Sequence, residues 1–165
     1  MHRRRPGPGD DHRSRLDAAV LQPDTGQAMS RENVGVVRRA YERWNSMHKS
    51  ELEAWLAEFV APEIEWHDAP LFPAATVTRG IDAYRRHVQD YLEVWAESTI
   101  EIEEIGSVGD RVVARIRYDG VGEQFGTNVV GVPLGAVYDL REGRIVRVQQ
   151  FDDYSEALEA AELPE

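Results

Sequence analysis

Apolar positions recur at helical spacing in three stretches of the first hundred residues, and each stretch predicts an amphipathic helix. The first helix runs from 30 to about 45, with Ser30 as its N-cap. The second follows Ser50 and Glu53, which have the spacing of a capping box, and Pro62 ends it. The third begins at Ile81, after a proline-rich loop over 70–79. The three apolar stripes are Val34, Val37, Tyr41 and Trp44; Leu52, Trp55, Leu56 and Phe59; and Ile81, Tyr84, Val88, Tyr91, Leu92 and Trp95.

Beyond residue 97 the hydrophobic period changes from helical to alternating, and turn signals divide the rest of the chain into long strands. Gly109 with Asp110 marks one tight turn and Gly143 another, while the glycine-rich segment 120–126 joins two strands. Pro133 predicts a bulge or an edge position within its strand. The segment 155–163 predicts a short C-terminal helix. This order predicts an α+β domain, in which three N-terminal helices pack on a curved, mainly antiparallel sheet and leave a cone-shaped hollow.

The short strand around Trp66 carries the most informative chemistry. Alternate side chains of a strand share a face, so Ile64, Trp66 and Asp68 are expected to point the same way. This places a carboxylate at the mouth of an apolar pocket, where low polarity is expected to raise its pKa. Asp68 is therefore a candidate catalytic acid–base group, although an aspartate can also cap the loop that follows. His67 is a second candidate; it points to the opposite face unless a bulge exchanges the two residues.

Large aromatic residues are concentrated in the helical half of the chain and in this first strand. Their polar edges suit a flat, apolar ligand, although the same residues can serve only as core. In the last strand, alternation places the Gln150 amide on the same side as Val146 and Val148, where it needs a hydrogen-bond partner or a ligand. The expected pocket-lining residues are Tyr41, Trp44, Trp55, Trp66, Tyr91, Trp95, Tyr118 and Gln150.

Composition excludes several classes of function. The formal net charge of −11 disfavours a nucleic-acid partner, because phosphate binding needs a basic surface. The chain has no cysteine, which excludes disulfides and cysteine metal sites, and its five histidines lack ligand spacing, so we expect no metal or other cofactor. Nowhere do about 18 apolar residues follow one another, so no membrane-spanning helix is expected and the cytoplasm is the expected location.

The N-terminal segment 1–28 differs from the rest of the chain. It contains the run Arg3–Arg5, several prolines and glycines, and one short apolar patch over 16–21. Such a composition cannot bury enough apolar surface to offset its ordering entropy, so we expect a disordered tail over 1–28 and a folded domain over 29–165. Met29 stands just before a favourable helix opening, which makes it a candidate for the true translation start.

With this order of elements, the chain resembles the nuclear transport factor 2-like superfamily and, within it, the SnoaL-like proteins. The resemblance covers Ser30 to about Leu163 and implies the cone-shaped fold of that superfamily. Its members isomerise steroids, close polyketide rings, open epoxides, or only bind and dimerise, so the resemblance alone does not settle function. It rests on the segments SRENVGVVRRAYERWN, EIEWHDAP, TRGIDAYRRHV and LREGRIVRVQQFDDYSEALEAAEL.

Compared with ketosteroid isomerase, Asp68 stands in the place of the proton-shuttling aspartate. The partner tyrosine of that enzyme would fall at about Ala40, with Tyr41 one step aside, and its second acid near Ala136. Its oxyanion hole needs both donors, so steroid isomerisation is not expected. Polyketide cyclases of the SnoaL type are similar in using an acid–base aspartate and few other groups, so the two missing positions weigh less against cyclase chemistry.

Epoxide hydrolases of this fold use two carboxylates bridged by an arginine. Asp68 or Asp119 with Arg115 or Arg117 could form such a set, which makes this chemistry a lesser alternative. Strand alternation, however, places Arg115, Arg117 and Asp119 opposite the apolar row that ends at Tyr118. If that row lines the hollow, these charges lie outside it.

Two hypotheses of different classes follow. In the first, the domain binds a small apolar molecule in an apolar pocket, with isomerase- or cyclase-type acid–base chemistry at Asp68. In the second, it is a non-catalytic binding or scaffold protein whose exposed sheet face forms a homodimer. A homodimer is expected under either hypothesis. An open cavity of about 300 Å³ or more with Asp68 on its wall would favour the first.

Overall fold

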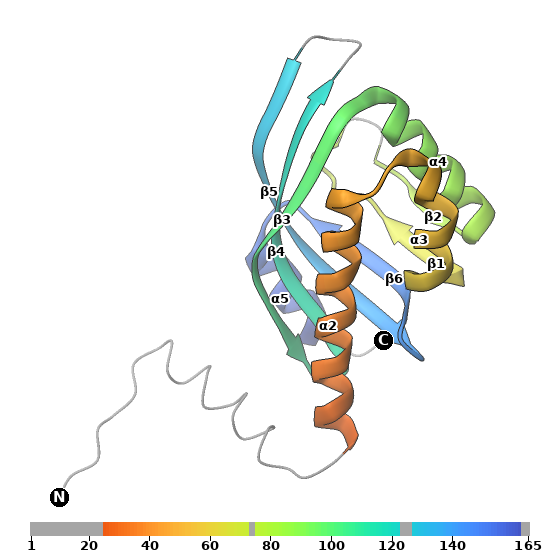
Figure 1. Ribbon diagram of the computed structural model, residues 1–165. Helices are drawn as coiled ribbons and strands as arrows, with labels where there is room; N and C mark the ends of the chain where they lie inside the picture. Colours follow the sequence, from red (N-terminus) through yellow and green to blue (C-terminus); the bar gives the residue numbers. More distant parts are fainter. Residues whose placement is uncertain (1–24, 73–74, 123–126, 163–165) are drawn as a thin grey trace, which may run out of the picture.

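Six strands form one open sheet in the order β2-β1-β6-β5-β4-β3 (Figure 1). The computed structural model describes residues 25–72, 75–122 and 127–162, and for 25–29, 95–97, 121–122 and 127–130 it describes the backbone alone. The strands are β1 (Val60–His67), β2 (Val77–Arg79), β3 (Trp95–Val108), β4 (Arg111–Gly122), β5 (Thr127–Arg141) and β6 (Arg144–Phe151). The helices are α2 (Thr25–Ser46), α3 (Leu52–Phe59), α4 (Ile81–Val94) and α5 (Tyr154–Glu162), with a 3-10 turn η1 (Lys49–Glu51).

The predicted α+β class with a mainly antiparallel sheet is confirmed. Neighbouring strands run antiparallel except for β1 and β6, which are parallel. Figure 1 shows α2, α3 and α4 on one face of the sheet and α5 on the other. The main core lies between the first three helices and the sheet, and it contains Val37, Trp55, Ile64, Tyr84 and Ile116. A ligand cavity is therefore expected between this face of the sheet and the three helices.

Two predicted helix starts are wrong. Helix α2 already begins at Thr25, so Ser30 lies inside it, where its hydroxyl donates to the carbonyl oxygen of Gly109 at 3.1 Å. The capping contact before α3 joins the backbone N–H of His48 to Glu51 Oε1 at 2.8 Å. Glu53 pairs instead with Arg85 of α4 at 2.6 Å, a long-range ion pair that sequence spacing does not reveal. Residues 1–24, most of the predicted tail, lie outside the described part of the chain.

Two predicted helix ends are also displaced. Helix α3 stops at Phe59, because Val60 is already extended (φ −120°, ψ 130°), and Pro62 lies within β1 rather than at the end of the helix. A proline disfavours helical geometry in the residue before it, so the helix has to end upstream of Pro62. Helix α4 ends at Val94, and Trp95 begins β3 by pairing with Gly122 of β4. The predicted loop over 70–79 also contains the short edge strand β2.

The turn and edge signals in the second half agree with the structure. Glu142 (φ 53°) and Gly143 (φ 78°) form a two-residue turn between the paired residues Arg141 and Arg144. The pairing of β5 with β6 begins at Gly135. Pro133 precedes it in β5 and is therefore paired with β4 alone. That is an edge position, as predicted.

Helix α5 covers part of the sheet face that was expected to be bare. A second apolar cluster joins Val113 and Val137 of the sheet to Ala157 and Ala161 of α5. The helix approaches closely, since a Cβ on Gly135 would lie 2.6 Å from the carbonyl oxygen of Asp153. The expectation of helices on one side only is therefore wrong. Helix α5 can pack on this side because its small residues, Ala157 and Ala161, fit against Gly135 of β5.

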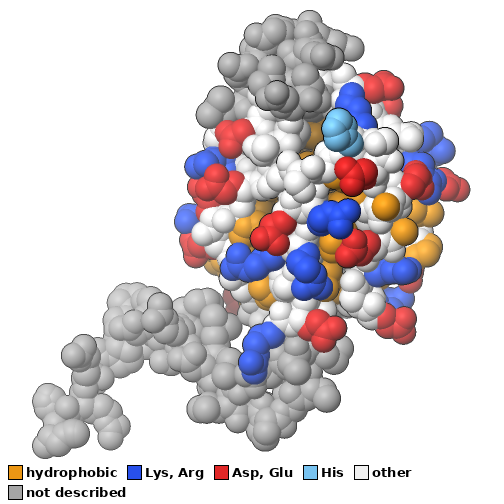
Figure 2. Space-filling model, in the orientation of Figure 1, with side chains coloured by type: hydrophobic (Ala, Val, Ile, Leu, Met, Phe, Trp, Pro, Cys, Tyr) orange, Lys and Arg blue, Asp and Glu red, His pale blue; other side chains and the backbone are white. Residues whose placement is uncertain are grey.

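The outer surface is strongly charged. Figure 2 shows acidic and basic side chains interspersed over the visible face, with hydrophobic side chains between them. On the far side of β4 from the core, Arg117 contacts Glu101 at 2.7 Å and Glu103 at 3.2 Å, and Arg115 contacts Glu104 at 2.6 Å. In the described part of the chain, no helix is long and apolar enough to cross a membrane.

A hydrogen bond between two buried tyrosines joins α2 to β5. The hydroxyl oxygens of Tyr41 and Tyr138 lie 2.6 Å apart, and their rings meet edge to face with centroids 6.1 Å apart. Burial raises the pKa of Tyr41 and of Tyr138 well above 10, so both hydroxyls stay protonated at neutral pH. The bond helps to fix the distance between the first helix and the sheet.

Tyr138→Phe is expected to lower the free energy of unfolding by about 1–2 kcal/mol, because it leaves the Tyr41 hydroxyl without its partner. Tyr41→Phe should do the same, and the double variant should lose clearly less than the sum of the two single losses. Urea unfolding of the four proteins measures this coupling. Strictly additive losses would show that the two hydroxyls do not stabilise each other.

Candidate functional site

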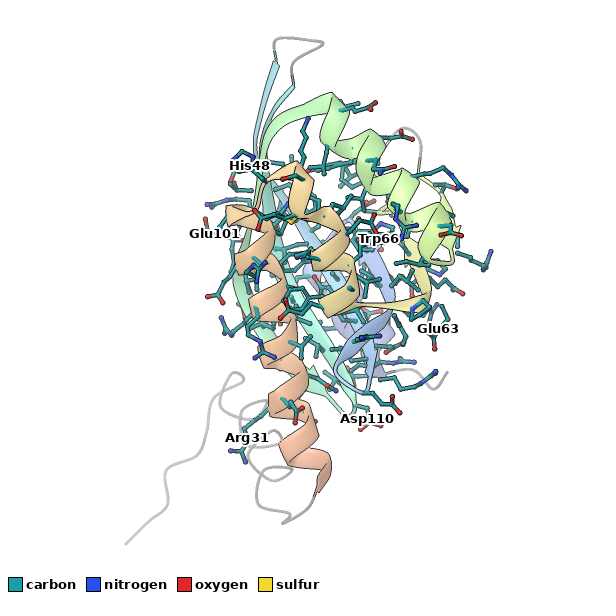
Figure 3. The ribbon with its side chains drawn as sticks, turned by 45° about the vertical axis from the view of Figure 1, so that its right-hand side comes forward. Arg31, His48, Glu63, Trp66, Glu101 and Asp110 are labelled. Atoms are coloured by element: carbon teal, nitrogen blue, oxygen red, sulfur yellow. The ribbon has the colours of Figure 1, made fainter. Side chains whose placement is uncertain are left out.

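A cavity of about 540 Å³ lies between helices α2, α3 and α4 and the inner face of the sheet. Its wall is mainly aromatic and aliphatic, and most of it comes from the apolar stripes described above. Figure 3 shows Trp66 between α3 and α4, whereas Glu63 from the same strand lies at the periphery. The side chain of Trp95 lies outside the described part of the structure. Of the residues expected to line a pocket, the structure places these on the wall: Tyr41, Trp44, Trp55, Trp66, Tyr91, Tyr118 and Gln150.

Asp68 follows directly on β1 and belongs to the cavity wall, with its side chain 12% exposed. The indole N–H of Trp66 donates to its Oδ1 at 2.8 Å, and the backbone N–H of Thr76 donates to its Oδ2 at 3.3 Å. His87 Nε2 of α4 lies 3.4 Å from the same Oδ1. The carboxylate therefore caps the loop that follows β1, as the structural interpretation predicts, and it also lies on the wall of the cavity.

The direction of the Asp68 pKa is opposite to the one expected from an apolar pocket. Burial acts to raise it, but the contact with His87 and the hydrogen bonds from Trp66 and Thr76 outweigh burial and bring the pKa below the ordinary 3.8. The apolar neighbours are visible in the sequence, whereas two of the three donors come from elsewhere in the fold. At neutral pH the group is ionised, so it can take up a proton but has none to give.

His87 and Tyr84 also line the wall beside Asp68, and neither was expected there. The Tyr84 ring lies 5.3 Å from the Trp66 ring, and the rings of Tyr84 and His87 stack with centroids 6.4 Å apart. Their spacing of three residues places both on one face of α4. That spacing was the available signal, because Tyr84 belongs to the apolar stripe and His87 is its neighbour on that face.

His67 lies outside the residues that line this cavity. Its Nε2 contacts Glu65 Oε1 at 2.6 Å on the opposite face of β1, and Arg79 and Arg147 contact the same glutamate at 3.4 and 3.5 Å. This hydrogen bond and the two arginines lower the pKa of Glu65. With Trp66 facing inward, strand alternation accounts for this orientation of His67.

Other polar groups of the wall are hydrogen-bonded to one another. Gln150 Nε2 donates to the Tyr118 hydroxyl at 2.9 Å, which supplies the partner that its inward position requires. Val146 does not share this side, because a register shift beside Asp139 turns it to the opposite face. The hydroxyls of Tyr91 and Ser98 lie 2.6 Å apart. Burial also raises the pKa of Tyr118 and of Tyr91, so these groups stay neutral.

The residues needed for the epoxide-hydrolase alternative lie elsewhere. Arg115, Arg117 and Asp119 do not line the cavity, and Arg117 Nε lies 3.5 Å from Asp119 Oδ2 on the other side of β4. Among the described residues, the wall has one carboxylate and no arginine. Two carboxylates bridged by a guanidinium are therefore not brought together in the described cavity.

A second hollow, of about 610 Å³, lies on the opposite face of the sheet, beside α5. Charged residues such as Arg111, Asp139 and Arg147 line it, and Arg111 Nε lies 3.2 Å from Asp139 Oδ1. It is slightly larger, but most of its charged side chains pair with one another, since Arg141 also contacts Glu63 at 2.9 Å and Arg147 contacts Glu65 at 3.5 Å. Within the described ranges, no group of three or more histidine or acidic side chains could hold a metal ion. The aromatic cavity is therefore the candidate functional site.

Comparisons with known proteins agree with this architecture. Residues 37–148 match the family model of the SnoaL-like domain. A search of curated proteins finds no match. A protein from Jannaschia sp. CCS1, described as a proposed SnoaL-like polyketide cyclase, is similar in structure, with a TM-score of 0.64 and 19% identity over 83% of this chain and 96% of that one.

Two further solved structures share the fold and were determined with small molecules. TerC, co-crystallised with polyporic acid, has a TM-score of 0.59 and 17% identity over 79% of this chain and 97% of its own. A hypothetical protein from Catenulispora acidiphila DSM 44928 with a ketosteroid isomerase-like fold, in complex with trimethylamine, has a TM-score of 0.59 and 18% identity over 78% and 93%. At these identities the likeness shows the fold alone. With more than half of its length matched by the family model, the chain belongs to the SnoaL-like domain family.

Proposed function

We propose that this protein binds a small, mostly apolar molecule in the aromatic cavity and that Asp68 acts on it as a general base. The observation that carries the proposal is an ionised carboxylate, 12% exposed, on the wall of an otherwise apolar cavity of about 540 Å³. A volume of this size suits a small metabolite, and few polar groups on an apolar wall are typical of ligand pockets.

The chemistry that suits these groups is proton transfer within one molecule. Asp68 would take a proton from the ligand and return it to another atom of the same ligand, so an isomerisation or ring closure needs no further reactant. His87 lies 3.4 Å from Asp68 and its side chain is 32% exposed, so it is placed to exchange a proton between the carboxyl group and solvent. Isomerase- or cyclase-type chemistry is therefore the reaction class we favour.

The relatives support small-molecule binding as a role of this fold. One is described as a proposed polyketide cyclase, one was co-crystallised with polyporic acid and one with trimethylamine. Steroid isomerisation is not proposed, because alanines stand at both positions expected for its oxyanion donors, and Ala40 and Ala136 are fully buried among the core residues.

A non-catalytic binding protein, expected to be a homodimer, is the second candidate. It is favoured by the donors already bonded to Asp68, because the same contacts that keep the carboxylate ionised also occupy much of its capacity to accept a proton. Part of the sheet face opposite the cavity carries the half-buried residues Glu65, His67 and Arg147, and we infer that a second copy packs there. Under this alternative the cavity retains a ligand without changing it.

The test is capture of apolar molecules from cell extract on the wild type, Asp68→Asn and Glu63→Gln, with identification by mass spectrometry. Glu63→Gln is the matched control, because it removes one negative charge from the same strand at an exposed position. The molecule retained by Asp68→Asn should be converted when it is mixed with wild type or Glu63→Gln, and it should stay unchanged with Asp68→Asn.

The outcomes separate the candidates. If all three proteins retain the same molecule and none converts it, the protein binds without chemistry. If no apolar molecule is retained by any of them, the cavity is not a binding site and the proposal fails.

A further inference from the structure

No permanently charged cation lies beside the Asp68 carboxylate among the residues described on the cavity wall. Among the described residues, the cavity wall has no lysine and no arginine, and Asp68 is its one carboxylate. The groups that face this carboxylate are the Trp66 indole, the His87 imidazole, the Thr76 backbone N–H and the Tyr84 phenol. Only His87 can carry a positive charge. A ligand with a negative charge would therefore meet repulsion at this position.

The carboxylate also has acceptor capacity to spare. Its two oxygens offer about four acceptor sites. Three donors lie within reach, namely Trp66 Nε1 at 2.8 Å, Thr76 N at 3.3 Å and His87 Nε2 at 3.4 Å. One acceptor site is left for a donor from the cavity, and an N–H of an ammonium group makes the strongest such bond.

The rest of the wall offers aromatic ring faces to a ligand, because most of its tyrosine hydroxyls are already hydrogen-bonded to other protein groups. Tyr41 bonds to Tyr138, Tyr118 to Gln150, and Tyr91 to Ser98. The rings of Trp66 and Tyr84 lie beside the carboxylate with centroids 5.3 Å apart. Aromatic faces attract cations through their negative potential, and the attraction is larger in a site with little water.

We infer that the ligand of this cavity carries a positive charge: it is an organic ammonium ion with apolar substituents, its charge at Asp68 and its apolar part among the aromatic side chains. The inference rests on the proposed ligand binding and names the ligand class; it does not depend on the acid–base step. The net charge of −11 adds a long-range attraction for cations. The lowered pKa of Asp68 keeps the carboxylate charged at neutral pH.

The test compares two probes of one shape, N,N-dimethylbenzylamine, which is protonated at neutral pH, and isobutylbenzene, its uncharged carbon isostere. Affinities are measured by calorimetry and by the fluorescence of the tryptophans that line the cavity. The wild type should bind the amine more tightly than the hydrocarbon. Asp68→Asn should weaken amine binding about tenfold, since an ion pair in a largely buried site is lost, and change hydrocarbon binding by less than about twofold. Glu63→Gln should match the wild type.

Each failure has a separate meaning. Unchanged binding of the hydrocarbon by Asp68→Asn shows that the variant keeps its fold and cavity. If the hydrocarbon binds but the amine binds no better, or if Asp68→Asn and Glu63→Gln weaken the amine equally, the inference is wrong and the proposed function stands. If the wild type binds neither probe, the proposed ligand binding itself fails.

Discussion

The hydrogen bond from the Trp66 indole to Asp68 is the interaction on which the rest of the site depends. The two residues are two positions apart at the end of β1, so strand alternation places them on the same inward face. Burial alone would raise the pKa of this carboxyl group, but the contact with His87, the indole donor and the Thr76 N–H favour the charged form and lower it. The same indole packs against Tyr84 and His87, and thereby ties the carboxylate to helix α4.

The position of β1 in the sheet explains why this pair faces a cavity. The strand lies between β2 and β6 and runs parallel to β6, with His67 opposite Gln149. Helices α3 and α4 flank it in the chain and cover its inner face (Figure 1). The Tyr41–Tyr138 bond helps to hold α2 in place on the same sheet face. The wall is therefore made by elements that are each fixed by their own contacts, and the space between them stays open.

Local features of the site could be predicted from the sequence, and features that depend on distant partners could not. Alternation along one strand is enough to place Ile64, Trp66 and Asp68 on one face, and helical spacing is enough to find the aromatic stripes. The direction of the Asp68 pKa depends on His87 and Thr76, which reach it only through folding. The side of the sheet that α5 covers depends on its fit against Gly135. The hydrophobic pattern along α5 or along β5 does not show that the two elements fit together. The predicted helix caps are wrong for the same reason, since the side chains of Ser30 and Glu53 bond to residues far away in the chain.

The ionisation of Asp68 can be measured directly. Carbon-13 NMR of aspartate-labelled protein follows the carboxyl resonance, which Asp68→Asn assigns, as the pH falls from neutral to acid. A midpoint below 3.8, which rises when Trp66→Phe removes the indole donor, is the predicted result. A midpoint above 3.8 in the wild type would mean that burial prevails over the hydrogen bonds, and it would contradict the role of the indole donor and its neighbours in lowering the pKa.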